Sequence, residues 1–360
     1  MITTIKNVRV FDGKRMTEPQ DVSFENGIIV ANPENADAVI DGTGLSLLPG
    51  FIDTHIHIDS RDNCVLAAKA GITTLIDQMC NKTELIDSLK EPDEPIASVR
   101  SAYMPVQSKN GLLMILALGH KSEYAASKED VHRMIDREIA KGAIVVKLIL
   151  DVPPLTKGML EEELVAETVR YAHEKGKQVS AHCTTMLAYE RAVKCGVDIL
   201  NHIPKDTPMP QTIIDTIKAK NLTVIPTMVM QRGLVRNMKR WMPRRAGDFT
   251  NVVETVRLMH EAGIKLLVGT DSNNTNALCH IKHGESIWQE FELLHEAGLT
   301  YLEILRATTC EAAKVFGLSD RGSIEPGKRA DLVLVEGNPL EDITAVRNVK
   351  QVFVKGKHLK

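Results

Sequence analysis

One unit recurs along the middle of this 360-residue chain: a helix-like segment, then a glycine or asparagine, then a short run of aliphatic or β-branched residues. The glycine or asparagine stands where a helix would end in the left-handed conformation, which these two residue types tolerate best. The positions of this kind are Gly71, Gly142, Gly176, Gly196, Asn221 and Gly263. The apolar runs after them are short, as parallel strands buried on both faces are. The pattern therefore predicts alternating strands and helices around a parallel sheet.

Two further apolar runs, LLPGFIDTHIH at residues 47–57 and LLMILALGH at residues 112–120, bring the expected number of strands to eight. Eight such units within roughly 250 residues predict an α/β fold of the (β/α)8 TIM barrel type. We expect this barrel to span residues 51–325. The alternative is an open doubly wound sheet. That fold usually has a glycine-rich phosphate turn after its first strand, and a His-X-His sequence stands there in this chain.

The two ends of the chain differ from its middle. Residues 1–50 and 326–360 contain short strand-like pieces separated by turn signals, and neither end has a helical period. We therefore expect both termini to pair in one small composite β-sandwich domain beside the barrel. Because no low-complexity linker separates the two parts, we expect them to pack against each other.

Composition excludes several classes of function. The net charge of −3 does not favour a nucleic-acid or membrane surface as the partner, and no apolar run approaches the length of roughly 18 residues that spans a membrane. The start of the chain lacks the apolar segment of a signal peptide. Six cysteines are present without a CxxC pair, which predicts reduced thiols and a cytoplasmic location.

Ligand-type side chains lie at or near the ends of five of the predicted strands. His55 and His57 are two residues apart in a strand, so they share one face. The other members are Lys147, His182, His202 and Asp271. The carboxyl ends of barrel strands form one functional face. A single histidine at a strand end is more often structural, but five strands with such residues predict a metal centre.

Lys147 differs from the other members because an ammonium group has no lone pair for a metal. One interpretation is a salt bridge at the mouth of the barrel. The other is that burial near cations lowers the pKa of the amine, which then reacts with CO2. The resulting carbamate is an anionic oxygen ligand, and it can bridge two metals at the spacing of about 3.5–4 Å typical of two-metal sites.

The sequence PGFIDTHIH, the lysine, the later histidines and the GTD sequence that ends in Asp271 together resemble the amidohydrolase superfamily over essentially the whole chain. With a lysine on the fourth strand, the combination is most similar to the imidazolonepropionase-like and Xaa-Pro dipeptidase (prolidase-like) branch. The chain departs from that branch in two places: LALGH stands where the branch tends to have TGGH, and HCTTML where it often has HAYT.

The resemblance implies a role for each of these residues. The His-X-His pair and Asp271 would hold the more buried metal, His182 and His202 the second, and carboxylated Lys147 would bridge the two. Asp271 would take a proton from the attacking water and pass it to the leaving group. The implied cofactors are two zinc ions, with Mn2+ or another divalent metal as the alternative. A homo-oligomer is also implied.

Candidate substrate contacts lie in the loops after these strands. His120 ends the run at 112–120, and a structural loop histidine is the alternative for it. Tyr124 follows in the same loop, where surface packing is the alternative. Arg232 lies in a basic segment at 231–245, which is either a lid over an anionic substrate group or an amphipathic helix with a solvated basic face. Asn274 follows Asp271 closely and is placed to line the mouth.

These observations predict a metal-dependent hydrolase that cleaves an amide-type C–N bond in a small molecule. The substrate would be dipeptide-like, an N-acyl compound or a cyclic amide. A deaminase of a heterocyclic ring is the nearest alternative, although HCTTML lacks the glutamate that such enzymes usually have shortly after the fifth-strand histidine. A barrel without catalytic activity, used for binding or assembly, is the remote alternative.

Overall fold

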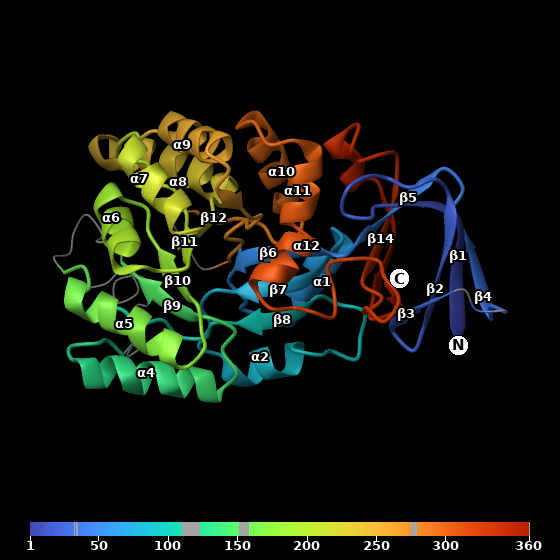
Figure 1. Ribbon diagram of the computed structural model, residues 1–360, viewed down its shortest axis with the longest axis horizontal. Helices are drawn as coiled ribbons and strands as arrows, with labels where there is room; N and C mark the ends of the chain where they lie inside the picture. Colours follow the sequence, from blue (N-terminus) through green and yellow to red (C-terminus); the bar gives the residue numbers. More distant parts are fainter. Residues whose placement is uncertain (32, 34, 110–122, 151–157, 275–278, 360) are drawn as a thin grey trace.

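The computed structural model describes residues 1–31, 33, 35–109, 123–150, 158–274 and 279–359. One part of the structure is a sheet to which both ends of the chain contribute (Figure 1). Its strands are β1 (Ile2–Val10), β2 (Gln20–Glu25), β3 (Ile28–Val30), β4 (Ala38–Asp41), β5 (Leu45–Pro49), β14 (Leu332–Glu336), β15 (Val349–Val354) and β16 (Lys357–His358). The order is β16-β15-β14-β5-β1-β2-β3, and β4 also pairs with β1.

Apolar side chains from both ends pack together within this sheet. Phe24 on β2 lies against Phe353 on β15, with ring centroids 5.2 Å apart, and Ile5 and Leu332 belong to the same buried cluster. Burial of such side chains contributes roughly 25 cal/mol per Å2 of apolar surface, so the pairing of the two ends is stabilised by their own core. The sandwich form of this part and the domain boundaries near residues 50 and 326 stay predictions.

The middle of the chain forms two parallel sheets. The first contains β6 (Phe51–Ile56), β7 (Ile72–Asp77) and β8 (Ser98–Ser101) in that order. The second contains β9 (Val146–Ile149), β10 (Val179–His182), β11 (Ile199–Asn201), β12 (Thr223–Ile225) and β13 (Lys265–Leu266), each beside its neighbour in sequence. All pairings within both sheets are parallel. The predicted α/β class with parallel strands is therefore confirmed.

Hydrogen bonds join the two parallel sheets to each other at both edges. At one edge, the Val106 N–H donates to the carbonyl of Lys147 at 2.8 Å. At the other, the Asp271 N–H donates to the carbonyl of His55 at 2.7 Å. Segments that follow β8 and β13 thus lie against β9 and β6, respectively. The contact between Asp271 and His55 therefore brings together a residue of the first and a residue that follows the last of the eight parallel strands that the structure describes.

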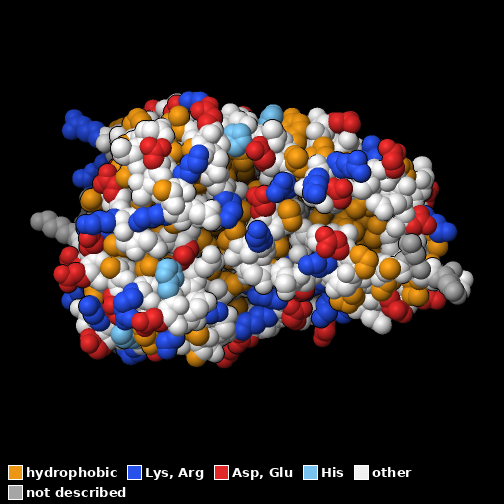
Figure 2. Space-filling view, viewed as in Figure 1, with side chains coloured by type: hydrophobic (Ala, Val, Ile, Leu, Met, Phe, Trp, Pro, Cys, Tyr) orange, Lys and Arg blue, Asp and Glu red, His pale blue; other side chains and the backbone are white. Residues whose placement is uncertain are grey.

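Helices alternate with these strands and lie around them (Figure 1). They are α1 (Arg61–Lys69), α2 (Thr83–Leu89), α4 (Lys128–Ala140), α5 (Glu162–Glu174), α6 (Met186–Cys195), α7 (Gln211–Ala219), α8 (Met228–Trp241), α9 (Phe249–Glu261), α10 (Ser286–Glu296), α11 (Tyr301–Ala307) and α12 (Cys310–Val315), with short 3-10 turns at Pro243–Arg245 and Ile343–Arg347. Among the described residues, no helix combines the length and apolar character needed to cross a membrane. Lysine and arginine side chains alternate with acidic ones over the face in Figure 2.

The predicted left-handed positions are confirmed. All six have a positive φ, from 52° at Asn221 to 91° at Gly142. Gly196, for example, has φ 83° at the C-cap of α6, and its N–H bonds to carbonyls of the last helical turn. These residues end each helix sharply and turn the chain into the next strand.

The third strand is not where the sequence pattern indicated. The structure forms β8 from Ser98–Ser101, whose sequence SVRS is too short and too polar to predict as a buried strand. It is nevertheless inside, because Ser98 and Ser101 are buried and β8 pairs with β7 over four residues. The run at 112–120, expected to form this strand, lies outside the described residues, and so does His120.

Candidate metal centre

His55, His57 and Asp271 lie together at the end of β6. Each of the three residues offers one possible ligand atom, and these three atoms all lie within 4.8 Å of one another. The Nε2 atom of His57 lies 3.0 Å from Asp271 Oδ1, and His55 Nε2 lies 3.7 Å from the same oxygen. His55 is buried and His57 is partly exposed. Two imidazoles and a carboxylate that converge in this way could hold a divalent metal.

Burial and neighbouring charges give these histidines different protonation behaviour. Burial, together with the positive charges of Lys147 and His57, lowers the pKa of His55 well below its usual range. Burial also opposes protonation of His57, but its hydrogen bond to Asp271 and the charge of that carboxylate raise its pKa overall. His55 is therefore a neutral imidazole near neutral pH, which is the form that binds metals.

His182 and His202 form a second group beside the first. His182 ends β10 and His202 follows β11, and His202 Nε2 lies 2.7 Å from His182 Nδ1. The His202 ring is 4.8 Å from the His55 ring, centroid to centroid, and its Nδ1 is 4.0 Å from Asp271 Oδ2. Burial and the nearby histidines lower the pKa of His202 well below its usual range, so it too is neutral. The two groups are therefore adjacent.

Lys147 points into the same buried region from β9. Its side chain has an exposed fraction of 2%, and its Nζ donates a hydrogen bond to Gln78 Oε1 at 3.2 Å. Within the part of the chain that the structure describes, no carboxylate forms a salt bridge with this ammonium. Burial lowers the pKa of Lys147 to about 7. A substantial fraction of the amine is therefore uncharged at neutral pH, as reaction with CO2 requires.

Three residues of this region hold the left-handed backbone conformation without being glycine. They are His202 (φ 69°), Asp271 (φ 56°) and Thr227 (φ 49°). Left-handed conformations are uncommon for residues other than glycine, and they persist where surrounding contacts hold them. Here the His202 N–H bonds to the carbonyl of Ile225 at 2.8 Å. The conformation at His202 also interrupts the alternation of the strand, so that Asn201 and His202 both contact members of the site.

The donor set fits a metal on chemical grounds. The atoms that converge are histidine ring nitrogens and carboxylate oxygens, which suit Zn2+ and similar divalent ions. Each of the two groups supplies nitrogen ligands, and Asp271 lies close to both. The residues present are therefore consistent with a metal-binding site.

Two of the predicted substrate contacts, Tyr124 and Arg232, have partners outside the predicted ligand set. Tyr124 is exposed, and the Lys109 ammonium sits 5.7 Å from its ring centroid. Arg232 is on α8, where its Nη2 donates to Gln289 Oε1 of α10 at 3.0 Å. That contact suits the amphipathic-helix interpretation of the segment, while its alternative as a lid stays a prediction, as do the substrate roles of both residues.

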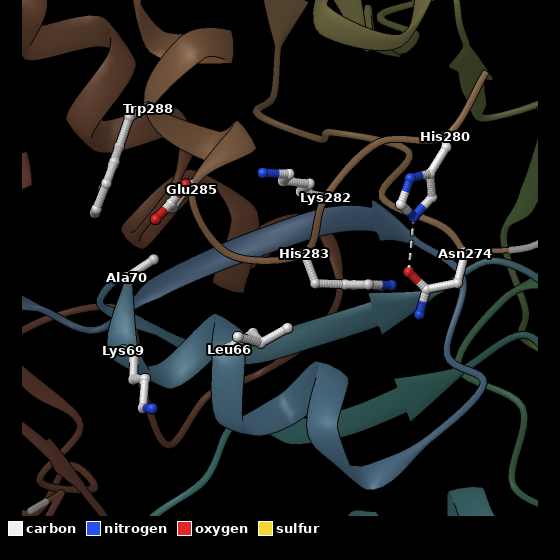
Figure 3. Close-up of a pocket in the computed structure, with 9 residues that line it drawn as sticks. All are labelled: Leu66, Lys69, Ala70, Asn274, His280, Lys282, His283, Glu285 and Trp288. Carbon is white, nitrogen blue, oxygen red and sulfur yellow. Dashed lines mark hydrogen bonds between the residues drawn. The ribbon is translucent and has the colours of Figure 1, made fainter.

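Asn274 lies at one end of a groove between α1 and the start of α10 (Figure 3). The groove has a volume of about 410 Å3, and its described lining includes Leu66, His283 and Trp288. Asn274 Oδ1 accepts a hydrogen bond from His280 at 3.0 Å, and its Nδ2 donates to Asp59. None of the six predicted metal ligands is among the described residues that line this groove. The role of Asn274 in binding substrate stays a prediction.

Sequence reasoning missed the polar residues that surround the ligands. The side-chain oxygen of Asn201 accepts a hydrogen bond from His55, and that of Gln78 accepts one from Lys147. The hydroxyl oxygen of Thr227 lies 2.7 Å from Nδ1 of His202. Their positions carried a weak signal: Gln78 directly follows a strand that ends in Asp77, and Asn201 directly precedes a predicted ligand. Strict alternation would turn Asn201 away from the site, and the left-handed residue that follows it removes this constraint.

Comparison with known families agrees with this geometry. The model of the amidohydrolase family matches residues 46–359, which is nearly the whole chain. The chain therefore belongs to the amidohydrolase family, and the resemblance found in the sequence is confirmed at the level of the family.

Curated relatives include proteins of two activities. An adenine deaminase of Gluconobacter oxydans is 25% identical over 349 residues, which are 92% of this chain and 55% of that protein. A 5-methylthioadenosine/S-adenosylhomocysteine deaminase of Bacillus cereus is 21% identical over 430 residues, covering 100% of this chain and 94% of that protein. The chain thus spans about half the length of the adenine deaminases that it matches.

Among solved structures, a Xaa-Pro dipeptidase with bound methionine superimposes with a TM-score of 0.86 at 22% identity, covering 100% of both chains. A prolidase complexed with N-methylphosphonate-L-proline has a TM-score of 0.82 at 23% identity, again over 100% of both chains. At this level of identity, the likeness establishes a shared fold.

Proposed function

We propose that this protein is a metal-dependent hydrolase that cleaves an amide-type C–N bond in a small molecule. The observation that carries the proposal is the convergence of His55, His57 and Asp271 next to the His182–His202 pair. In this proposal the two parallel sheets form a closed (β/α)8 barrel over residues 51–325, and the ligands occupy the carboxyl ends of its strands. The strands of both termini form a separate sandwich domain.

The six residues take distinct roles. His55 and His57 would hold one ion with Asp271, His182 and His202 would hold the other, and a carbamate on Lys147 would supply an anionic oxygen ligand between the two groups. When bound there, divalent ions such as Zn2+ or Mn2+ would supply the positive charge that makes a water more acidic and polarises the scissile carbonyl. The Asp271 carboxylate would accept the proton of the attacking water and then deliver it to the leaving nitrogen. The neutral state of His55 and His202 keeps their ring nitrogens available as ligands.

The carbamate forms when the uncharged Lys147 amine attacks CO2. The nitrogen lone pair makes the new N–C bond, one C=O electron pair moves to oxygen, and one proton leaves the nitrogen for solvent. Burial of Lys147 supports this step because it lowers the pKa of the amine to about 7. Intact-mass measurement under native conditions, with and without bicarbonate, tests it through a gain of one CO2.

The test of the function is a substrate screen on metal-loaded protein with Xaa-Pro dipeptides, N-acyl amino acids, lactams and imides. Release of a free amine or acid from one of these classes is expected. Removal of the metal by a chelator should abolish turnover, and Zn2+ or Mn2+ should restore it. Protein that neither binds these ions nor responds to them would overturn the proposal.

A heterocyclic deaminase is the second candidate, favoured by the names of curated relatives. Its chemistry also breaks a C–N bond, but the leaving group is ammonia from a ring carbon. Adenine and 5-methylthioadenosine belong in the same screen, with ammonia as the measured product. Turnover of these purines, together with an unmodified Lys147, would favour this candidate over the amide hydrolase. Self-association into a homo-oligomer and a cytoplasmic location stay predictions, as does the absence of nucleic-acid and membrane partners.

A further inference from the structure

We propose that Asn201 is a positioning residue that sets which ring nitrogen of His55 faces the metal centre. The proposal rests on the proposed metal-dependent function and extends it to a residue that binds no metal itself. Asn201 ends β11 and is completely buried, and its Oδ1 lies 2.7 Å from His55 Nδ1.

The orientation of the Asn201 amide follows from its other partners. Its Nδ2 lies 3.0 Å from the carbonyl oxygen of Ala181 and 2.7 Å from Ser180 Oγ. A carbonyl oxygen only accepts hydrogen bonds, so the NH2 group must be on this side. The amide oxygen is therefore the atom that faces His55.

The tautomer of His55 follows in turn. An amide oxygen only accepts, so the short contact requires the hydrogen of the imidazole to be on Nδ1. A neutral imidazole carries one ring hydrogen, which leaves the lone pair on Nε2. That nitrogen is on the side of Asp271, 3.7 Å from Oδ1. Asn201 thus presents the lone pair of His55 where the other ligands converge, as outer hydrogen-bond partners of metal-bound histidines do.

The same network reaches Lys147. Ser180 Oγ donates to Gln78 Oε1 at 3.0 Å, and Lys147 Nζ donates to the same oxygen at 3.2 Å. Gln78 Nε2 donates to the Thr54 carbonyl at 3.1 Å, which fixes that amide by the same reasoning. Asn201, Ser180 and Gln78 are all fully buried. Water does not compete for these groups, so each donor must keep its acceptor and the directions of the bonds are fixed.

The first test is the tautomer of His55 in metal-free wild-type protein, measured by long-range 1H–15N correlation on 15N-histidine-labelled chain. The His55→Gln variant identifies the signal. We expect hydrogen on Nδ1 and a lone pair on Nε2. Hydrogen on Nε2 overturns the proposal. This measurement needs no Asn201 variant to fold, and it remains decisive even if the wild-type protein binds no metal and the proposed function fails.

The second test compares Asn201→Leu with Ser180→Ala in a Zn2+ competition titration against a chelator. Asn201→Leu removes the acceptor of His55 and should weaken the tighter-bound ion by roughly 10–100-fold, with His55 in a mixture of tautomers. Ser180→Ala leaves the Asn201–His55 and Asn201–Ala181 contacts in place, so its effect should stay within about 3-fold. Wild-type affinity in Asn201→Leu, or equal losses in both variants, contradicts the positioning role.

Discussion

The two ligand groups of the candidate centre are assembled to different degrees. His55 is on β6 and His57 follows its last residue, and Asp271 is tied to this segment by its backbone bond to His55 and by its contact with His57. His182 ends β10 and His202 follows β11; the two rings contact each other, and Asp271 Oδ2 lies 4.0 Å from His202 Nδ1. The first group thus combines histidine nitrogens with a carboxylate oxygen, and in the proposed centre a carbamate on Lys147 would add an oxygen ligand to the second.

The largest expected effect comes from Asp271→Asn, because this residue belongs to the first group and also lies near the second. Loss of the proton acceptor alone should lower kcat/KM by at least about 10²-fold. Steady-state kinetics on metal-saturated protein measure this. Asp248→Asn, at the partly exposed N-cap of α9, is the control and should keep wild-type kinetics. A fully active Asp271→Asn variant would remove Asp271 from the mechanism.

Lys147→Ala separates the two groups more selectively. The variant removes the proposed bridge but none of the ligands of the first group, so bound metal should fall from two ions per chain to one. Metal analysis after gel filtration measures the ratio. The control variant is Lys177→Ala. Lys177 lies just before β10, and its Nζ donates a hydrogen bond to the Ala143 carbonyl. Two ions retained in Lys147→Ala would show that the second group needs no bridge.

Thr227→Val should weaken the second group and leave the first unchanged. The Thr227 hydroxyl donates to the Pro226 carbonyl at 2.8 Å, so its oxygen accepts the Nδ1 hydrogen of His202. Valine has a similar shape without this acceptor, and the weaker-bound ion should lose about 10-fold in affinity. The buried Thr223→Val on β12 is the matched control. Equal losses at both ions would indicate a general packing defect instead.

The smallest effect on the centre is expected from Glu290→Gln, which acts on stability. Glu290 accepts from the N–H groups of Met228 and Val229 at the start of α8, and burial raises its pKa from 4.5 to about 8. Between those pH values the folded chain binds more protons here than the unfolded chain. Stability from this group therefore falls as the pH rises, by about 1.4 kcal/mol per pH unit.

The Glu290→Gln variant should lack that slope. Denaturant unfolding at several pH values from 4.5 to 8 measures it, with the exposed Glu296→Gln on the same helix as control. Metal affinity should change little in either variant. An unchanged slope in Glu290→Gln would mean that this carboxyl does not titrate in the expected range.

The sequence predicted what depends on local pattern. Glycines and Asn221 marked helix ends correctly, and apolar runs marked seven of the eight parallel strands that the structure describes. β8 was missed because its burial comes from neighbours such as β7, and its own residues are polar. Contacts such as Asn201 to His55 span 146 residues. No local pattern encodes them, and they become visible only when the strands lie side by side.

The pairing of β5 with β14 also has a consequence for biosynthesis. The Ser46 hydroxyl bonds to the Gly337 carbonyl, 291 residues later in the chain. At translation rates of roughly 5–20 residues per second, β5 waits on the order of 15–60 s on the ribosome for this partner. During that interval Leu47 and Leu48, which end up completely buried, have no cover from β14. The sheet formed by the two ends can therefore be completed only after β14 has been synthesised, and until then β5 lacks this neighbour.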